Sequence, residues 1–191
     1  MRAQGWDYLI LTAANETQAD AYRTQLDLRR RLGLLGAFGQ TLVVADPGGK
    51  RVGSGGSTIF CLGEILDHAR GSNVDAIHGA EGWTRILRGL RILIVHAGGD
   101  SRRLPAYGPC GKVFMPLPNH SDSAISSTVF DCQLPVYAAL PTPTGEDGQV
   151  VITSGDVLLE FSPDEVRFED CGITGLGCRA APERASRHGV Y

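Results

Sequence analysis

Short apolar runs recur along the chain and alternate with segments that carry apolar residues at helical spacing. The runs cover Tyr8–Thr12, Thr41–Ala45, Arg91–Ala97 and Gln149–Thr153. Each is nearly continuous in apolar residues, which is typical of strands that are buried on both faces of a parallel sheet. The pattern therefore predicts an α/β fold, a three-layer α/β/α sandwich around a mostly parallel sheet.

Three helices are expected between these strands. The first begins with a capping box at Asn15–Gln18 and ends at Gly33. The second follows a glycine-rich loop and takes Ser57 or Thr58 as its N-cap. The third is shorter and spans residues 81–88, with apolar positions at helical spacing.

The pattern is less regular in the second half of the chain. Residues Lys112–Pro118 predict an extended segment, and Val129–Leu140 predict a helix with Pro135 near its start or at a kink. Residues Ser162–Glu165 carry a helix-start signature, a cap followed by proline and two acids. The 191 residues fit one domain, in which we expect residues 163–191 to be the poorly packed tail of an interrupted, truncated domain.

Composition and charge exclude several classes of protein. The net charge of −3 argues against the basic face that nucleic-acid binding requires. No apolar run approaches the roughly 18 residues that a membrane-spanning helix needs. The five cysteines form no Cys-X-X-Cys pair, so they predict neither a disulfide framework nor a zinc site. We therefore expect a cytoplasmic protein that binds neither nucleic acid nor membrane.

Glycine and lysine are distributed unevenly. The chain holds 25 glycines, roughly twice the average share of about 7 %. Only two of its 18 basic residues, Lys50 and Lys112, are lysines, and both lie in glycine-rich segments. Phosphate is bound by backbone N–H groups of such loops, by helix N-termini and by basic side chains. These segments are therefore the first candidates for a nucleotide site.

The first segment, Asp46–Thr58, connects a predicted strand to a predicted helix. It matches neither a Walker A loop nor the Gly-X-Gly-X-X-Gly pattern, and a flexible strand–helix turn is the alternative interpretation. The nucleotide-binding candidates in this segment are Arg51, Gly53, Ser54, Gly55, Gly56, Ser57 and Thr58.

The second segment, His96–Lys112, also follows a strand, and open α/β sheets bind nucleotides at the carboxyl ends of their strands. Its candidates are the nucleotide-binding residues Gly98, Gly99, Ser101 and Arg102 and the catalytic residues Arg103 and Lys112. A solvated basic loop is the alternative interpretation. His96 lies at the strand end and either lines the site or has a structural role.

The third segment, Ser154–Asp156, ends a strand with a carboxylate. Mg²⁺ binds one or two carboxylates together with phosphate oxygens and water, so a carboxylate here is suited to hold a metal beside phosphates. Asp156 is therefore the candidate metal ligand and a candidate catalytic residue, and Mg²⁺ is the expected cofactor. An aspartate in an ordinary turn is the alternative interpretation.

The second segment resembles a known signature. Residues Gly98–Pro105, with the sequence GGDSRRLP, are followed by Lys112 and Pro116, and this arrangement is similar to that of sugar nucleotidyltransferases. Two positions depart from the usual pattern. Ser101 stands where glycine is usual, and Gly111 stands where proline usually precedes the lysine.

Over most of residues 6–191 the chain resembles the N-terminal region of the bifunctional L-fucokinase/fucose-1-phosphate guanylyltransferases. The segments that carry this resemblance are Trp6–Thr12, Asp46–Pro47, Arg51–Thr58, His96–Pro118 and Ser154–Leu158. The resemblance implies the N-terminal part of a Rossmann-like nucleotidyltransferase domain that transfers GMP from GTP to L-fucose 1-phosphate. It also implies that the rest of a longer bifunctional chain is a partner, whereas no residue here supports a sugar kinase.

Roles for individual residues follow from the resemblance. It implies that Arg102 and Arg103 hold the triphosphate, that Lys112 contacts the α-phosphate or the sugar phosphate, and that Asp156 carries the metal. Residues 53–58 would contact the base and ribose, but which glycine-rich loop holds the triphosphate stays open. A non-catalytic nucleotide-binding or docking module of a longer protein is the alternative function.

Overall fold

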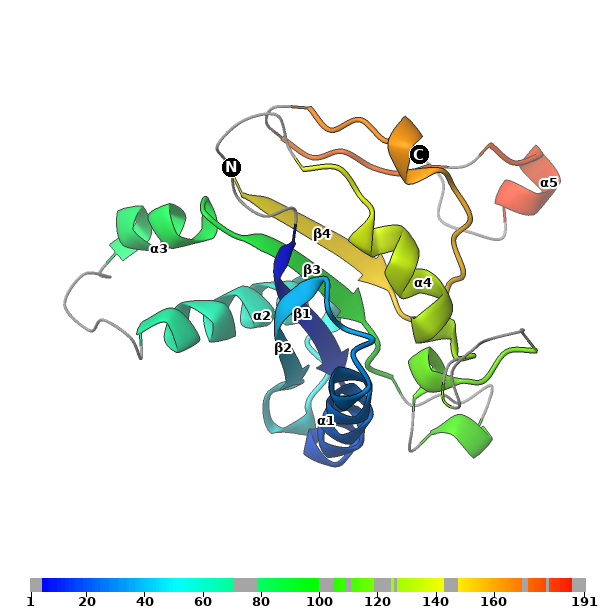
Figure 1. The fold of residues 1–191 in the computed structure, drawn as a ribbon, viewed down its shortest axis with the longest axis horizontal. Coiled ribbons are helices and arrows are strands. Elements are labelled where there is room, and N and C mark those ends of the chain that lie inside the picture. Colours follow the sequence, from blue (N-terminus) through cyan, green and yellow to red (C-terminus); the bar gives the residue numbers. More distant parts are fainter. Residues whose placement is uncertain are drawn as a thin grey trace.

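The computed structural model describes residues 5–70, 79–99, 105–108, 111–118, 125, 127–142, 148–169, 172–177 and 179–186. In this part of the chain a four-stranded, all-parallel sheet has the strand order β2-β1-β3-β4 (Figure 1). The strands are β1 (Trp6–Ala13), β2 (Phe38–Ala45), β3 (Arg91–His96) and β4 (Gln149–Ser154). The four predicted strands and their parallel arrangement are confirmed.

Helices cover both faces of this sheet (Figure 1). They are α1 (Glu16–Arg31), α2 (Gly53–Arg70), α3 (Gly79–Leu87) and α4 (Val129–Ala138). The short α5 (Pro182–Ala185) has no buried residue and lies away from the sheet (Figure 1). Among the described residues, none of these helices is both long and apolar enough to cross a membrane. One apolar core lies between the sheet and helices α1 and α4, and a second lies between the sheet and helices α2 and α3. The predicted three-layer sandwich is therefore confirmed.

Neighbouring residues of the central strands point alternately into the two cores. Leu9 and Leu11 of β1 lie in the first core, and Ile10 between them lies in the second. In β3, Leu93 lies in the first core and Ile94 in the second. Because both faces of these strands are covered, apolar residues are favoured at every position. This explains why the runs in the sequence are continuous.

The predicted start of α1 is confirmed in its main feature. The Asn15 side chain accepts a hydrogen bond from the Gln18 N–H at 2.9 Å, as an N-cap does. The Gln18 side-chain oxygen, however, accepts from the Ala14 N–H at 2.8 Å rather than from the N–H of the N-cap itself. Gly33 follows the helix with a φ of 76°, a conformation that glycine adopts readily at helix C-termini.

Three local predictions are wrong. Helix α2 begins at Gly53, one turn before the predicted N-caps Ser57 and Thr58, because the glycine-rich residues after Gly53 wind into its first turn. The extended segment predicted for Lys112–Pro118 is wrong in its first part, because Lys112–Phe114 form a 3-10 turn, whereas Met115 is extended and Pro116 forms a β-bridge with Thr128. The helix-start signature before Val166 produces only a 3-10 turn, Pro163–Glu165.

Helix α4 begins at a capping box in which Thr128 and Asp131 bind each other's backbone N–H groups. Pro135 lies well inside the helix rather than near its start. Because proline has no N–H, the helix forgoes the hydrogen bond that this position would donate to the Asp131 carbonyl. Burial of Phe130 and Leu134 in the first core stabilises the helix across that gap.

A buried ion pair joins α1 to α4. Arg29 is 1 % exposed, and its Nε and Nη2 atoms donate to the two carboxylate oxygens of Asp131 at 2.7 Å each. The guanidinium also lies over the ring of Phe114, 4.7 Å from its centroid. Arg29 therefore holds both α4 and the 112–114 turn against α1, and that turn carries Lys112.

Replacing Arg29 by methionine should destabilise the fold by about 3–5 kcal/mol, because the Asp131 carboxylate stays buried without its charge partner. Urea unfolding measures this difference in the free energy of unfolding. The matched control is Arg23→Met on the same helix. Arg23 pairs with Asp20 at 2.6 Å, but both side chains are exposed, so this loss should cost less than about 1 kcal/mol. Equal losses in the two variants would contradict the structural role of the buried pair.

Candidate functional site

The carboxyl ends of β1 and β3 lie side by side in the middle of the sheet. The chain continues from β1 to β2 on one side and from β3 to β4 on the other. Such a reversal opens a crevice at the strand ends, which is where open α/β sheets bind ligands. Gly98 lies here: a Cβ atom built on it would come within 3.1 Å of the Ala13 carbonyl carbon. The loop after β3 therefore lies directly against the end of β1.

A cavity of about 210 Å³ opens at this edge of the sheet. It is lined by His96, Ala97, Gly98, Gly99, Lys112, Val113, Ser154, Gly155 and Asp156. The segment after β3 and the segment after β4, which the sequence singles out separately, thus meet in one cavity. Of the predicted site residues, Gly98, Gly99, Lys112 and Asp156 are brought together here.

Lys112 and Asp156 form an ion pair in this cavity, with 3.1 Å between Nζ and Oδ2. The Ser154 hydroxyl donates to the other carboxylate oxygen of Asp156 at 2.8 Å. These hydrogen bonds, first from Ser154 and then from Lys112, hold the pKa of Asp156 below its usual range, so the carboxylate is charged at neutral pH. The Lys112 and Asp156 side chains are 29 % and 47 % exposed. A ligand can therefore reach both charges.

The backbone after β3 is held by two side chains from the first part of the chain. The Thr12 hydroxyl oxygen accepts from the N–H groups of Ala97 and Gly98 at 3.2 and 3.3 Å. The Tyr22 hydroxyl donates to the Ala97 carbonyl at 2.9 Å. Because the Gly98 N–H is bound within the fold, this glycine contributes close packing against β1 rather than an N–H group for phosphate.

Two other glycines allow the walls of the cavity to approach each other. The Gly155 N–H donates to the His96 carbonyl at 2.8 Å, and a Cβ atom on Gly155 would lie 3.1 Å from that oxygen. Gly111 has a φ of 66° and lies directly against the ring of Tyr22. The turn that carries Lys112 is therefore seated on α1.

The first glycine-rich segment lies at the same edge of the sheet but does not line this cavity. Arg51, Gly53, Ser54 and Gly55 are exposed, and Gly56 is half-buried. The Ser57 hydroxyl donates to Asp46 at 2.7 Å, and the Thr58 hydroxyl lies 2.9 Å from His96 Nε2. These two hydroxyls connect α2 to the ends of β2 and β3. The structure therefore favours a structural role for Ser57 and Thr58 over contact with a nucleotide.

His96 combines the two roles that the sequence leaves open. It lines the cavity, and its Nε2 atom contacts Thr58. Burial lowers the pKa of His96, and the charge of Asp46 only partly offsets this effect. The imidazole is therefore neutral at pH 7 and acts as a hydrogen-bonding group.

Some site residues are missed by sequence reasoning, and others cannot be placed. Ser101, Arg102 and Arg103 lie outside the described residues. Thr12 is not marked by any motif, the capping box identifies Gln18 only as part of a helix start, and helical spacing identifies Tyr22 only as a core residue. The signal that points to them is structural: Thr12 and Gln18 are polar side chains that are 3 % and 6 % exposed, and such groups need hydrogen-bond partners.

The oxygen atoms around Asp156 suit a metal ion that is also bound by the phosphates of a nucleotide. Among the described residues, no three His, Cys, Asp or Glu side chains gather into a metal site. The cavity instead offers one ionised carboxylate beside the Ser154 hydroxyl. Mg²⁺ is commonly held by one or two carboxylates, substrate phosphates and water rather than by an all-protein cage. Asp156 therefore fits this kind of site.

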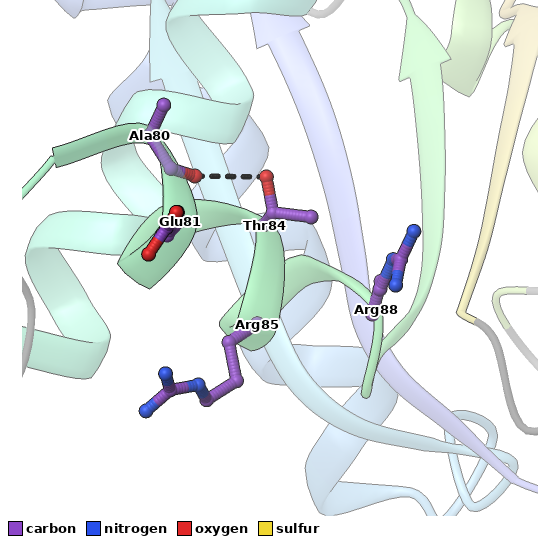
Figure 2. Close-up of a pocket in the computed structure, with 5 residues that line it drawn as sticks. All are labelled: Ala80, Glu81, Thr84, Arg85 and Arg88. Carbon is purple, nitrogen blue, oxygen red and sulfur yellow. Dashed lines mark hydrogen bonds between the residues drawn. The ribbon is translucent and has the colours of Figure 1, made fainter.

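A larger depression of about 430 Å³ runs along α3 (Figure 2). It is lined by Ala80, Glu81, Thr84, Arg85 and Arg88. The Thr84 hydroxyl is bound to the Ala80 carbonyl at 2.8 Å, and the side chains of Arg85 and Arg88 point away from each other. Arg88 lies shortly before β3, at the amino edge of the sheet. Because ligands of such sheets bind at the carboxyl edge, we assign no function to this depression.

Comparison with known proteins gives one family. A model of the fucose pyrophosphorylase domain matches residues 84–191. The chain is 33 % identical over 199 residues to the bifunctional fucokinase/GDP-fucose pyrophosphorylase of Arabidopsis thaliana, covering 99 % of this chain and 19 % of the relative. It is 30 % identical over 196 residues to human fucose-1-phosphate guanylyltransferase, covering 100 % of this chain and 29 % of the relative. No solved structure matches the chain.

A bacterial relative is also similar. The L-fucokinase/L-fucose-1-P guanylyltransferase of Bacteroides fragilis is 31 % identical over 150 residues, which cover 77 % of this chain and 15 % of the relative. The chain therefore spans less than a third of the length of the curated relatives that it matches.

Proposed function

Because the chain belongs to the fucose pyrophosphorylase family, we propose that it binds GTP and L-fucose 1-phosphate and transfers GMP between them, giving GDP-fucose and pyrophosphate. The observation that carries this proposal is the cavity at the ends of β3 and β4, where Lys112 and Asp156 place opposite charges within reach of a ligand. The identity of the sugar and the guanine nucleotide is taken from the names of the relatives.

The reaction brings two anions together. A phosphate oxygen of fucose 1-phosphate forms a bond to the α-phosphorus of GTP, and the bond between that phosphorus and the pyrophosphate oxygen breaks. Catalysis consists mainly of positioning the partners and neutralising their charge. Lys112 suits this task because its ammonium is a compact point charge, which would contact the α-phosphate or the sugar phosphate.

Asp156 would hold Mg²⁺ together with phosphate oxygens of the nucleotide, and Ser154 keeps the carboxylate ionised for that purpose. When bound, the ion would neutralise charge on the leaving pyrophosphate. Lys112 would then exchange its contact with Asp156 for one with phosphate. The ion pair with Asp156 keeps both groups in the cavity.

The other predicted residues have supporting parts in this proposal. Arg102 and Arg103 would hold the triphosphate, and Arg51 with residues 53–56 would contact the base and ribose. The rest of a longer, bifunctional chain would be the partner of this part. We place the protein in the cytoplasm, because the five cysteines suggest no disulfide framework.

Thermal unfolding with and without ligands tests the proposal. At a GTP concentration about 100 times Kd, with Mg²⁺ present, the melting temperature should rise by about 5–10 °C, and ATP should give a smaller shift. Fucose 1-phosphate added to the GTP complex should yield GDP-fucose, measured by chromatography. GTP binding without product would favour the non-catalytic nucleotide-binding module. No shift at millimolar GTP would overturn the proposal.

A further inference from the structure

Gln18, in the first turn of α1, is a buried side chain whose amide joins three separate parts of the chain. Its oxygen accepts from the Ala14 N–H at 2.8 Å, just after β1. Its nitrogen donates to the carbonyls of Gly99 and Gly108, at 3.4 Å each. A glutamine amide carries two N–H donors, so one hydrogen can serve each carbonyl. The side chain is 6 % exposed.

The two carbonyls that Gln18 binds belong to two different segments, one that lines the cavity and one that leads into the turn of Lys112. Gly99 lines the cavity after β3, and Gly108 precedes the turn that carries Lys112. The next turn of the same helix repeats the arrangement, because Tyr22 donates to the Ala97 carbonyl and lies against Gly111. One face of α1 therefore sets the spacing between the backbone after β3 and Lys112.

From this geometry we infer that Gln18 is a positioning residue for nucleotide binding, acting through the Gly99 and Gly108 carbonyls without touching the ligand. The inference rests on the proposed function, because it takes the cavity to be the nucleotide site. It assigns a role to a residue that lies outside the matched part of the family model, residues 84–191. The competing explanation is that Gln18 only caps the helix.

Two substitutions separate positioning from capping. Gln18→Glu keeps an oxygen for the Ala14 N–H and places a carboxylate in the first turn, where it favours the helix, but at pH 8 it removes both donors. Gln18→Met removes all three hydrogen bonds and adds no charge. The matched control is Thr17→Glu, an exposed position in the same turn. This control adds the same charge without removing the contacts to Gly99 and Gly108.

The measurement is the Kd for GTP with Mg²⁺, together with the melting temperature. We expect Kd to rise about tenfold in Gln18→Glu and Gln18→Met, because the carbonyls of Gly99 and Gly108 lose their shared donor, and to stay within about twofold in Thr17→Glu. Both Gln18 variants should melt below the native chain, because each loses buried hydrogen bonds, so Kd is measured well below the lower melting temperature. An unchanged Kd in either Gln18 variant would overturn the inference, as would a Kd that rises equally in Thr17→Glu.

Hydrogen exchange supplies a readout that needs no ligand. The amides of Phe114 and Met115 are hydrogen-bonded to the carbonyls of Gly111 and Lys112, and we expect them to exchange faster in Gln18→Glu than in Thr17→Glu. Unchanged exchange would overturn the positioning role. If the native chain binds no GTP but exchange still rises in Gln18→Glu, the proposed function fails while the positioning of this backbone stands.

Discussion

Replacing Asp156 by asparagine should abolish the magnesium-dependent part of GTP binding and slow GMP transfer by about 10²–10³-fold or more. Asparagine keeps the shape of the side chain and can still accept from Ser154, but it removes the charge that a divalent ion requires. The measurement is the ratio of Kd for GTP in EDTA to Kd in Mg²⁺. We expect this ratio to fall to near one in the variant.

GTP binding by Asp156→Asn in EDTA is an internal control, because it shows whether the substitution has damaged the whole site. Asp156 lies 3.1 Å from Lys112, so its neutralisation leaves a more positive cavity. GTP binding in EDTA should therefore be unchanged or tighter, whereas a damaged fold would weaken it in both conditions. Because the pKa of Asp156 is held below its usual range, Asp156 itself should add no pH dependence to the native ratio between about pH 6 and 8. A ratio that survives in Asp156→Asn would exclude this residue as the metal ligand.

The sheet could be predicted from sequence because its burial is two-sided. Leu9, Ile10 and Leu11 enter different cores but are all apolar, so the continuous run in the sequence indicates a strand covered on both faces. The start of α2 could not be predicted in the same way. Ser57 and Thr58 are good N-cap residues, but their hydroxyls bind Asp46 and His96, which lie far from them in sequence.

The sequence could predict which segments contribute to the candidate site, but not how these segments are arranged around it. Glycine and charge after a strand single out residues near Gly98 and Asp156, because parallel strands end at one edge of the sheet. Which segments share a cavity depends on the strand order, and β3 and β4 are neighbours while β2 lies on the far side of β1. The polar contacts of Gln18 cross between distant segments and leave no periodic signal in the sequence.

Replacing Gly111 by alanine should destabilise the fold by about 2–6 kcal/mol, a large part of the roughly 5–15 kcal/mol that holds a domain together. Its φ of 66° and ψ of 155° lie in a region that is open almost only to glycine, and strain there costs about 1–3 kcal/mol. A Cβ atom would also lie 2.6 Å from Cζ of Tyr22, and overpacking of this kind costs about 1–3 kcal/mol more. Urea unfolding measures the sum.

Gly33→Ala is the matched control that separates the backbone strain from the clash with Tyr22. Gly33 also has a positive φ, 76°, but a Cβ atom there would meet nothing within 4 Å, so only about 1–2 kcal/mol of backbone strain is expected. Equal losses at both positions would show that Tyr22 does not constrain the turn. A larger loss at Gly111 would show that Tyr22 constrains the turn beyond its positive φ, which on its own already disfavours proline, with φ fixed near −65°, before Lys112.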